Sequence, residues 1–436
     1  MLKSFVKVIF WRLIRWIDGP QKLRQFGEPI FWLTGFRRSV NRRRPPANLA
    51  VIKLDRLGDV VLCSQLLAGL RRGWPNTRIT LFVRQSLVDL ARLCRDVDEV
   101  VGVPVDEGNM VFDPRSEEYY GWGQQLAKWL EFCHQGKFWK RRFGATLVPR
   151  WDTDYYGALP LAYLLGAPLR WGATEAAMAD KVVANRDFDR LLTHVVKGRS
   201  VRHEVLLNKS FLQMLNIEPI AGEKLVSWVK ESDQKKAADI MVASGVDFSR
   251  KAIVVCMGAG WPSKMWPVAS YASLCKAAFD FETVQFLTFG TAAESNLGLQ
   301  LGNMLGGVVI NLEGKLPLGL LPAAVSLGSL YIGSDTGTKH LAAAAGLPVF
   351  EINCHPRAGK PYWAESPRRF GPWSVLSRVV QPEKATAPCE THCIAGESHC
   401  ILGVSDKLAV DALRSFLEQP DLKRLVRSEL NSTTVT

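Results

Sequence analysis

The sequence predicts an α/β protein with two parallel-sheet domains, and two segments far apart in the chain support this prediction. One is Lys53-Leu54-Asp55-Arg56-Leu57-Gly58-Asp59, and the other is Gly333-Ser334-Asp335-Thr336-Gly337-Thr338-Lys339-His340; each follows an apolar run. Each has the pattern of a strand end, a glycine turn and a first helical turn, which aims backbone N–H groups beyond the strand. A chain of 436 residues also exceeds one ordinary core. We therefore expect two parallel sheets facing a cleft that takes a phosphate-bearing ligand.

Short apolar runs alternate with helical patterns through the first half of the chain, which is typical of βαβ units. The expected strands are Asn48–Leu54, Arg78–Val83, Val97–Val103, Ala145–Val148 and Leu169–Trp171. The expected helices are Val60–Trp74, Leu87–Cys94, Tyr155–Leu165 and His203–Leu215. Residues 104–142 are polar and rich in aromatic residues, and we interpret them as an insertion because they break the alternation.

A second alternating series fills the other half of the chain. Its expected strands are Ala252–Met257, Thr283–Phe289, Val308–Leu312, Leu330–Ile332 and Pro348–Ile352. Its expected helices are Val268–Phe279, Ala292–Leu305, Leu318–Leu327, Thr338–Ala345 and Asp406–Leu417. The predicted organisation is a basic extension over residues 1–46, a first domain over 47–216, a linker over 217–250, a second domain over 251–420 and a flexible tail over 421–436.

The positive charge of the chain is concentrated at its N-terminus. Residues 1–44 hold eleven Lys or Arg and two acids, which accounts for +9 of the net charge of +13. One face of a helix over this segment carries large apolar residues and the opposite face carries cations: Phe5, Val6, Ile9, Leu13, Trp16 and Ile17 against Lys3, Lys7, Arg12 and Arg15. This pattern favours a helix lying in an anionic membrane interface, with a helix packed on the protein's own surface as the alternative.

Other interpretations of the N-terminus fit less well. Arg12 and Arg15 interrupt the apolar run, which argues against a transmembrane span and against a signal peptide. The interleaved apolar residues favour lipid over nucleic acid as the partner, and we expect no nucleic-acid binding. We expect the protein in the cytoplasm, peripherally attached to the inner face of the cytoplasmic membrane, with its nine cysteines reduced.

Asp59 is the candidate catalytic residue of the first half. Its carboxylate comes directly after Gly58, at a strand-to-helix turn, where it would project into the cleft and accept a proton from a sugar hydroxyl. The alternative is an N-cap aspartate that only satisfies first-turn N–H groups, and position alone favours this alternative.

The segment from Gly333 to His340 is the candidate phosphate site of the second half. Gly337 allows close approach of a phosphate, and the N–H groups of Gly337, Thr338 and Lys339 can donate to it. Thr336 and Thr338 add hydroxyl groups, Asp335 can hold a sugar hydroxyl, and His340 lies one turn into the helix. An ordinary capped turn is the alternative, but the density of polar groups favours a binding site.

Two further loops follow strands of the second half. Lys264, between two Trp-Pro pairs, would neutralise a diphosphate leaving group, with a solvated loop lysine as the alternative. Glu294 follows the strand-end glycine Gly290 and would bind ribose hydroxyls, or it is a first-turn acid favoured by the helix dipole.

The cysteine-rich segment near the C-terminus gives a weak metal signal. Its candidate ligands are Cys354, Cys389, Cys393 and Cys400, with His392 and His399 nearby. The spacing has no CxxC pair, so unliganded thiols are the favoured interpretation, and we expect no metal and no cofactor. The sequence also lacks GxSxG, Walker A, HExxH and EF-hand motifs.

These motifs, taken in order, resemble the heptosyltransferase-like glycosyltransferases of family 9. The segment Ala50–Leu62 with Trp74-Pro75 resembles the opening of that family, and Ser334-Asp335-Thr336-Gly337 with His340-Leu341-Ala342-Ala343 resembles its second signature. The loop ending in Lys264-Met265-Trp266-Pro267 and the segment Gly290–Glu294 occur in the family's order. The resemblance spans roughly Asn48 to Leu417.

The resemblance implies a GT-B fold with two Rossmann-like domains, and metal-independent, inverting sugar transfer. It implies that the N-terminal domain binds the acceptor, with Asp59 as general base and with Gly58 and Lys53 at the acceptor side of the cleft. The C-terminal domain would bind the nucleotide-sugar donor, with Lys264 at the diphosphate and Glu294 at the ribose. Asp335 would face the sugar, Thr336 and Gly337 the phosphates, and Thr338 and His340 would belong to the same donor site.

The leading hypothesis is transfer of heptose from ADP-heptose to a lipid-linked glycan such as lipopolysaccharide core. The sequence departs from the family pattern at Asp55-Arg56 and Thr338-Lys339, which leaves another nucleotide sugar or a protein acceptor open. A nicotinamide-dependent oxidoreductase would need a complete GxGxxG, which is absent. A non-catalytic adaptor is a further alternative, and the retention of Asp59, Lys264, Glu294 and Asp335 argues against it.

Overall fold

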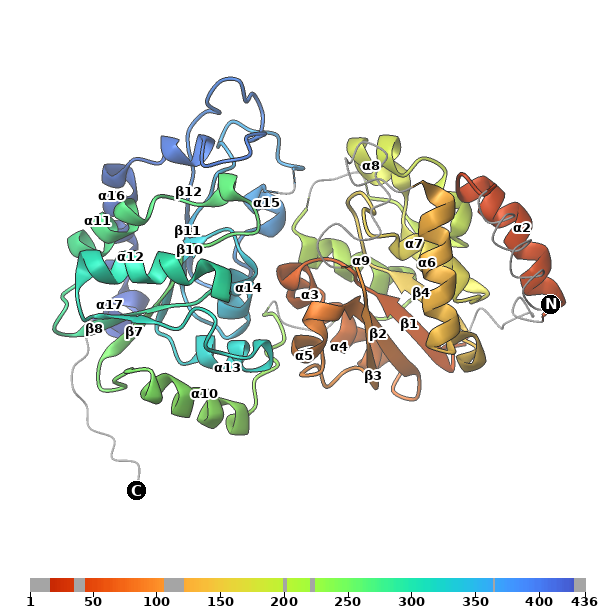
Figure 1. Ribbon diagram of the computed structural model, residues 1–436, viewed down its shortest axis with the longest axis horizontal. Coiled ribbons are helices and arrows are strands. Elements are labelled where there is room, and N and C mark those ends of the chain that lie inside the picture. The colour runs from red at the N-terminus through yellow and green to blue at the C-terminus, as the bar shows by residue number, and fades with distance from the viewer. Residues whose placement is uncertain are drawn as a thin grey trace, which may run out of the picture. The chain divides into compact units, whose positions relative to one another are not determined.

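The computed structural model describes residues 16–34, 44–105, 121–198, 202–219, 224–363 and 365–426. Its chain divides into two compact units (Figure 1). The first comprises Met1–Ser200 and Val205–Ala221, and the second comprises Val201–Glu204 and Gly222–Thr436. Each unit holds one six-stranded parallel sheet, so the predicted fold class is confirmed.

The sheet of the first unit has the strand order β3-β2-β1-β4-β5-β6. Its strands are β1 (Asn48–Ile52), β2 (Arg78–Arg84), β3 (Glu99–Val103), β4 (Ala145–Val148), β5 (Leu169–Ala173) and β6 (His194–Val196). The central strand β1 is almost wholly buried, and its Val51 pairs with Leu81 on one side and with Leu147 on the other. The chain fills the sheet outward from β1 to β3 and then from β4 to β6, so the strand order reverses between β1 and β4.

Helices cover this first sheet. They are α2 (Pro20–Leu33), α3 (Leu57–Leu62), α4 (Ser64–Gly73), α5 (Val88–Ala91), α6 (Trp122–Gln135), α7 (Ala158–Leu164), α8 (Ala179–Ala184) and α9 (Glu204–Met214). The expected helix Val60–Trp74 begins earlier and is split into α3 and α4 at Cys63. On α4, Gly69 allows a close approach, because a Cβ there would lie 2.5 Å from Leu212 of α9.

The described part of residues 104–142, which we expected to be an insertion, continues the alternation of strands and helices. Helix α6 lies between β3 and β4 in the chain and buries Leu126, Trp129 and Cys133 in the hydrophobic core of the first unit. The aromatic residues that suggested an insertion are therefore the apolar face of a crossover helix. Residues 106–120 of this stretch lie outside the described residues.

The second sheet has the order β12-β11-β10-β7-β8-β9. Its strands are β7 (Lys251–Cys256), β8 (Val284–Thr288), β9 (Val309–Asn311), β10 (Leu330–Ser334), β11 (Val349–Ile352) and β12 (Ser377–Val380). Here too the order reverses, between β7 and β10, and Val254 of β7 pairs with Tyr331 of β10. The edge strands β12 and β6 were not expected from the sequence.

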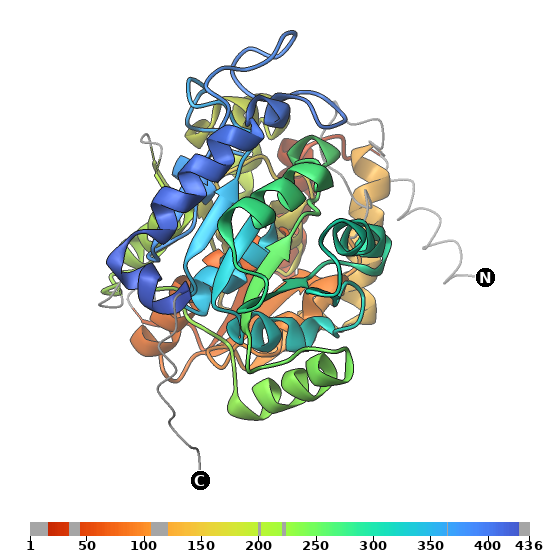
Figure 2. The ribbon, with the colours of Figure 1, turned by 90° about the vertical axis from the view of Figure 1, so that its left-hand side faces the viewer.

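The helices of the second unit are α10 (Glu231–Ala243), α11 (Val268–Ala278), α12 (Ser295–Leu305), α13 (Leu321–Ser326), α14 (Gly337–Ala344), α15 (Pro367–Phe370), α16 (Asp406–Leu417) and α17 (Pro420–Val426). Helix α11 packs between α12 and α16 over the sheet (Figure 2). Helix α10 lies in the expected linker 217–250 but packs on α13, and its Gln234 donates to Ser326 over 3.0 Å. The described residues from Lys224 onward thus belong to the second unit.

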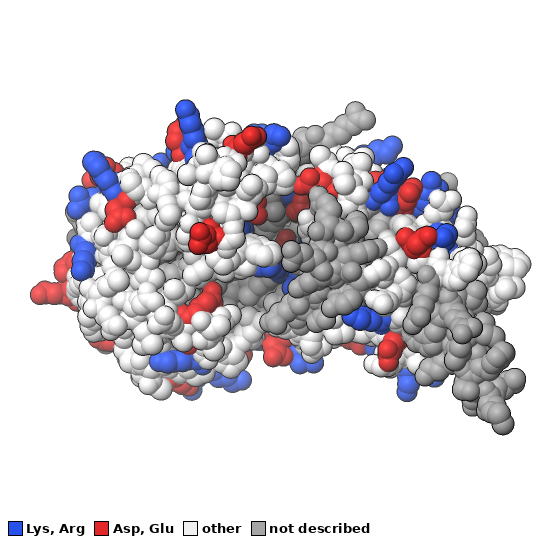
Figure 3. Space-filling model, turned by 45° about the horizontal axis from the view of Figure 1, so that its top comes forward, with Lys and Arg blue, Asp and Glu red and all other residues white. Residues whose placement is uncertain are grey.

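The basic N-terminal helix expected over residues 3–17 lies outside the described residues except for its last positions. The described helix α2 follows it and buries Leu23 and Phe31, while Phe26, Ile30 and Trp32 are exposed. Among the described residues, every helix is too short or too polar to span a membrane. On the face drawn in Figure 3, Lys and Arg are interspersed with Asp and Glu over the second unit, so no charge of one sign dominates there.

Candidate functional site

Most of the polar residues predicted to carry function follow the strands that flank each reversal, and Glu294 follows the adjacent strand β8. In doubly wound sheets, ligands bind at such a reversal because helices leave the sheet in opposite directions and open a crevice. In the first unit, Gly58 and Asp59 follow β1, and Arg150 follows the neighbouring strand β4. In the second unit, Lys264 follows β7, and Asp335 follows the neighbouring strand β10.

Asp59 is a half-buried residue in the first turn of α3. Arg56, not Asp59, occupies the N-cap position. The N-cap interpretation of Asp59 therefore does not describe the structure. Gly58, one residue earlier, is buried in the same turn.

Lys53 and Asp55 form a buried ion pair just after β1. Lys53 Nζ lies 2.8 Å from Asp55 Oδ2 and donates to the carbonyl of Pro149 over 3.0 Å, and Arg150 also contacts Asp55. Lys53, which was expected at the acceptor side of a cleft, is therefore a buried link between the ends of β1 and β4.

Cations surround Tyr156 at the same edge of the first sheet. The Arg84 guanidinium lies 4.0 Å from the Tyr156 ring centroid, and that of Arg150 lies 5.9 Å from it. Burial by itself would raise the pKa of the Tyr156 hydroxyl, but Arg84, Arg150 and Arg56 together lower it below its ordinary value. An anionic group bound at this edge would gain the same electrostatic stabilisation as the phenolate.

Lys264, Asp335 and Lys339 form the charged centre of the second unit. Lys264 Nζ lies 2.7 Å from one carboxylate oxygen of Asp335, and Lys339 Nζ lies 2.6 Å from the other. Burial would raise the pKa of Asp335, but the two ammonium groups lower it overall; Asp335, followed by Glu365, raises the pKa of Lys264 against the effect of burial. Lys264 is 13% exposed, so it is not the solvated loop lysine of the alternative interpretation.

A buried network of ion pairs and hydrogen bonds supports this charged centre. Lys339 Nζ lies 2.9 Å from Glu351, in the middle of β11, and Asn353 donates to the same Glu351 oxygen over 2.7 Å. Because Asp335 balances one side of Lys339 and Glu351 the other, the Lys339 ammonium is paired without contact with solvent. The network fixes the Asp335 carboxylate at the end of β10.

The first turn of α14 is the accessible part of the segment from Gly333 to His340. Thr336, Gly337 and Thr338 are half-buried, and Thr336 is the N-cap residue of the helix. Backbone N–H groups in the first turn of a helix lack intrahelical acceptors and favour anions. His340 is buried, and burial, with Lys339 next, lowers the pKa of its imidazole well below the ordinary value.

Glu294 lies beside the loop that carries Lys264. Its Oε2 atom accepts hydrogen bonds from the backbone N–H and the hydroxyl of Thr291, over 2.7 and 2.9 Å. Its Oε1 atom lies against Gly258, where a Cβ would approach it to 1.8 Å. Glu294 is thus both a capping-box residue and a carboxylate held at the ends of β7 and β8.

Glu313 is a second carboxyl group next to Glu294. It is buried after β9, and its Oε2 atom accepts from the Gly298 N–H over 2.9 Å. Burial raises the pKa of Glu313 to about 7, while the hydrogen bond from the Gly298 N–H partly opposes the rise and Glu294 adds to it.

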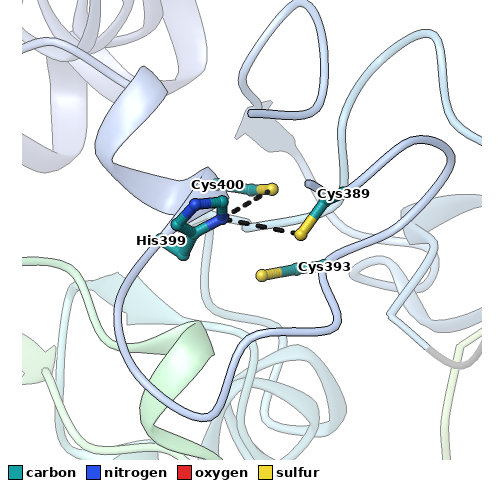
Figure 4. A group of neighbouring side chains, drawn as sticks. All are labelled: Cys389, Cys393, His399 and Cys400. Atoms are coloured by element: carbon teal, nitrogen blue, oxygen red, sulfur yellow. Dashed lines mark hydrogen bonds between the residues drawn. The ribbon is translucent and has the colours of Figure 1, made fainter. Parts of the chain in front are cut away.

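Three of the four candidate cysteines lie together in the loop after β12. The ligand atoms of Cys389, Cys393, His399 and Cys400 are all within 4.8 Å of one another, and their side chains converge (Figure 4). Cys354 is buried outside this group but near enough to Cys393 for an electrostatic interaction, and His392 stacks on Trp363 with ring centroids 3.6 Å apart. The sequence analysis favoured unliganded thiols, and the structure places three of these thiols together with His399.

Several residues of these sites were not expected from the sequence. Arg84 and Arg150 escape notice because only the sheet order brings the ends of β2 and β4 next to β1. Glu351 gives a usable signal, since it is a carboxylate in the otherwise apolar strand Val349–Ile352. Glu313 lacks such a signal, because it follows a short and half-buried strand.

The comparisons with known proteins agree on one family. Residues 161–398 match the sequence model of glycosyltransferase family 9 (heptosyltransferase). The chain is 21% identical over 348 residues to the lipopolysaccharide core heptosyltransferase OpsX of Haemophilus influenzae, covering 79% of this chain and 87% of that protein.

Two solved structures resemble the fold. A family 9 glycosyl transferase from Veillonella parvula superposes with a TM-score of 0.64 at 19% identity, covering 85% of this chain and 97% of that one. The ADP-heptose lipopolysaccharide heptosyltransferase II of E. coli superposes with a TM-score of 0.60 at 18% identity, covering 86% and 99%. The two-sheet architecture is shared along nearly the whole length of these proteins.

Proposed function

The chain belongs to glycosyltransferase family 9, and on this premise we propose that it transfers heptose from ADP-heptose, with inversion, to a membrane-linked glycan such as lipopolysaccharide core. That the protein is a glycosyltransferase follows from the family itself. The donor and acceptor are the proposed part. The observation that best supports a diphosphate-bearing donor is the Lys264–Asp335 pair at the reversal of the second sheet, beside the first turn of α14.

In the proposed reaction, the second unit binds the nucleotide sugar. Lys264 exchanges part of its contact with Asp335 for the donor diphosphate, and the N–H groups of Gly337 and Thr338 donate to the same phosphates. Glu294 accepts hydrogen bonds from the ribose hydroxyls, and Asp335 faces the sugar. His340 supports this site from the interior, because its imidazole is buried.

The first unit supplies the base and the acceptor site. Asp59 accepts the proton of the attacking hydroxyl as its oxygen bonds to the anomeric carbon and the bond to the diphosphate breaks. Attack opposite the leaving group inverts the anomeric configuration, and the developing negative charge is stabilised by Lys264 without a metal ion. Arg84 and Arg150 favour an acceptor that carries phosphate or carboxylate groups.

Helix α2 supports the proposed membrane location of the acceptor. Phe26, Ile30 and Trp32 are exposed on it, and residues 1–44 carry an excess of nine positive charges. Exposed apolar side chains beside cations are typical of helices that bind anionic membrane surfaces. We propose peripheral binding to the inner face of the cytoplasmic membrane.

The donor part of the proposal is tested by nucleotide binding. We expect calorimetry to show preference for ADP over UDP, GDP and NAD, and a loss of at least about tenfold in ADP affinity in Lys264→Ala. Lys276→Ala is the matched control, because this lysine is exposed in the last turn of α11. Preference for UDP or GDP would replace the donor, and NAD binding without preference for a diphosphate would contradict the transferase site.

The catalytic part is tested by transfer of heptose from ADP-heptose to a lipid-linked acceptor. Asp59→Asn should bind ADP normally but lower kcat by about 10²–10⁴-fold. The control is Asp89→Asn, an exposed first-turn aspartate of α5 paired with Arg92. Equal loss in both variants, or full activity of Asp59→Asn, would exclude Asp59 as the base.

A further inference from the structure

The loop between β12 and α16 has little regular structure for its length. Over residues 381–405 the described backbone forms only turns, bends and one 3-10 turn, Cys400–Gly403. Loops longer than about 12–15 residues without secondary structure are uncommon in compact domains and need another source of order. Yet Cys389 and Cys400 are buried here, and Cys393 and His399 are half-buried.

The four side chains of this loop have the chemistry of a metal site. Three thiols and one imidazole are a ligand set that binds Zn²⁺ in a closed tetrahedron. They come from Cys389, Cys393, His399 and Cys400, and their ligand atoms converge within 4.8 Å (Figure 4). We propose that these residues hold one structural Zn²⁺ ion.

The distances agree with tetrahedral coordination. With Zn–S bonds of about 2.3 Å and a Zn–N bond of about 2.0–2.1 Å, a tetrahedral ion holds a sulfur and a nitrogen ligand roughly 3.6 Å apart. His399 Nδ1 lies 3.5 Å from the sulfur of Cys389 and 3.6 Å from that of Cys400. The imidazole nitrogen is therefore at coordination spacing from two of the three sulfur atoms, and all four ligand atoms lie within 4.8 Å of one another.

A backbone contact supports the same interpretation. The N–H of Ile394 donates to Cys389 Sγ over 3.4 Å. Hydrogen bonds to ligand atoms orient them and are characteristic of the shell around metal sites. The backbone after Cys393 thus turns back to donate a hydrogen bond to the Cys389 sulfur.

The proposed ion also supports the loop of Lys264. Ser398, adjacent to His399, donates through its hydroxyl to the carbonyl of Met265 over 2.7 Å, and its Oγ lies 3.3 Å from the carbonyl of Pro262. Trp266 donates to the carbonyl of Val404 over 2.9 Å. Both ends of the turn that carries Lys264 are therefore fixed to the cysteine loop, so the ion orders the turn without contacting substrate.

Metal analysis of the full-length protein tests the proposal directly. We expect elemental analysis to find one zinc per chain, and the Co²⁺-exchanged protein to show the absorption of tetrahedral, thiolate-bound cobalt. No stoichiometric metal would overturn the site, and one iron per chain would overturn the assignment to zinc. A disulfide among these cysteines, detected by alkylation and mass spectrometry of the isolated protein, would also overturn it. These measurements on the unaltered chain do not depend on a variant folding.

Variants then assign the ligands. Cys393→Ser should reduce bound zinc to less than about one tenth, whereas Cys354→Ser, a buried thiol outside the group, should retain it. His399→Ala should weaken zinc binding by at least about tenfold in competition with a chelator, whereas His392→Ala should not. Equal zinc content in the two cysteine variants, or equal affinity in the two histidine variants, would contradict the assignment.

Hydrogen exchange tests the link to Lys264. Removal of zinc by a chelator should increase exchange in residues 261–266 as well as in residues 389–400. Faster exchange in residues 261–266 is the diagnostic result, since loss of zinc from an isolated surface site would leave their exchange unchanged. Zinc release without that change would overturn the role in ordering the turn.

Discussion

At the scale of single residues, Gly258 determines where the Glu294 carboxylate lies. A Cβ at this position would approach Glu294 Oε1 to 1.8 Å, far inside the closest contact of non-bonded atoms. The glutamate is the far end of a flexible side chain, so it would move instead of the backbone. The glycine is thus required by the position of the glutamate and not by its own backbone conformation.

We predict that Gly258→Ala lowers donor affinity with little loss of stability. Displacement of Glu294 would remove the hydrogen bonds that we propose it makes to the ribose, worth about 1–3 kcal/mol, or a roughly five- to hundredfold higher Kd for ADP. Calorimetry measures the affinity, and thermal unfolding measures the stability. Gly307→Ala is the control, because a Cβ there has no atom within 4 Å. Unchanged ADP binding in Gly258→Ala would show that Glu294 does not contribute to donor binding.

Glu313 makes stability depend on pH. Its pKa rises from 4.5 in the unfolded chain to about 7 in the folded protein, mainly through burial, with the hydrogen bond from Gly298 opposing the rise and Glu294 adding to it. Between these values the folded state binds more protons than the unfolded state, so stability falls as pH rises through this window.

We predict that Glu313→Gln removes this part of the pH dependence. The amide oxygen can still accept from Gly298, whereas the wild-type carboxyl loses about 1–2 kcal/mol between roughly pH 5 and pH 8. Urea unfolding of both proteins at the two pH values measures the difference. Glu282→Gln, at an exposed position, should retain the wild-type pH dependence. Parallel curves for wild type and Glu313→Gln would show that the group titrates normally.

At the scale of elements, α6 shows how composition can mislead. Its Trp129 is fully buried in the first core, although the surrounding segment looked like an insertion. We predict that Trp129→Ala destabilises the protein by about 3–5 kcal/mol. Trp32→Ala in α2, where the side chain is 73% exposed, should change stability by less than about 0.5 kcal/mol. Chemical denaturation monitored by circular dichroism compares them, and similar losses would refute the packing role of α6.

Many of the elements that sequence reasoning located have a strong hydrophobic pattern, although α9 and β9 were located without one. The central strands β1, β4, β7, β8 and β11 and helix α16 lie within about two residues of their predicted ranges, because buried apolar runs or a strong amphipathic face define them. The edge strands β6 and β12 were missed, whereas the edge strands β3 and β9, which are no more buried, were located. Helix α10 was missed because it buries only Ala237 and Met241.

The candidate site was predictable only where it is local in sequence. Asp59, Lys264, Glu294 and Asp335 could be placed at strand ends because glycine turns or short loops mark those ends. The partners Arg150 and Glu351 depend on which strands become neighbours, and hydrophobic patterns do not specify that order. Sequence spacing similarly could not show that His399, and not His392, joins the three cysteines.

At the scale of the whole molecule, charge is divided unevenly between the N-terminal segment and the rest. Residues 1–44 account for +9 and the remaining residues for +4 of the net charge. Helix α2, at the end of that segment, adds the exposed side chains of Phe26, Ile30 and Trp32. Cations alone would bind any polyanion, but the combination with exposed aromatic and aliphatic groups favours a lipid surface.

We predict that the full-length protein floats with anionic vesicles and not with neutral ones. Binding should weaken between about 0.1 and 1 M salt, because the Debye length falls from roughly 10 to 3 Å. Trp32→Glu should reduce binding at least about fivefold, since it removes an apolar contact and adds a negative charge at the surface. Val242→Glu makes the same kind of change at a 55% exposed valine of α10 and should bind normally. Equal losses in both variants would indicate a general charge effect, whereas binding to neutral vesicles at all salt concentrations would exclude the electrostatic part of the interaction.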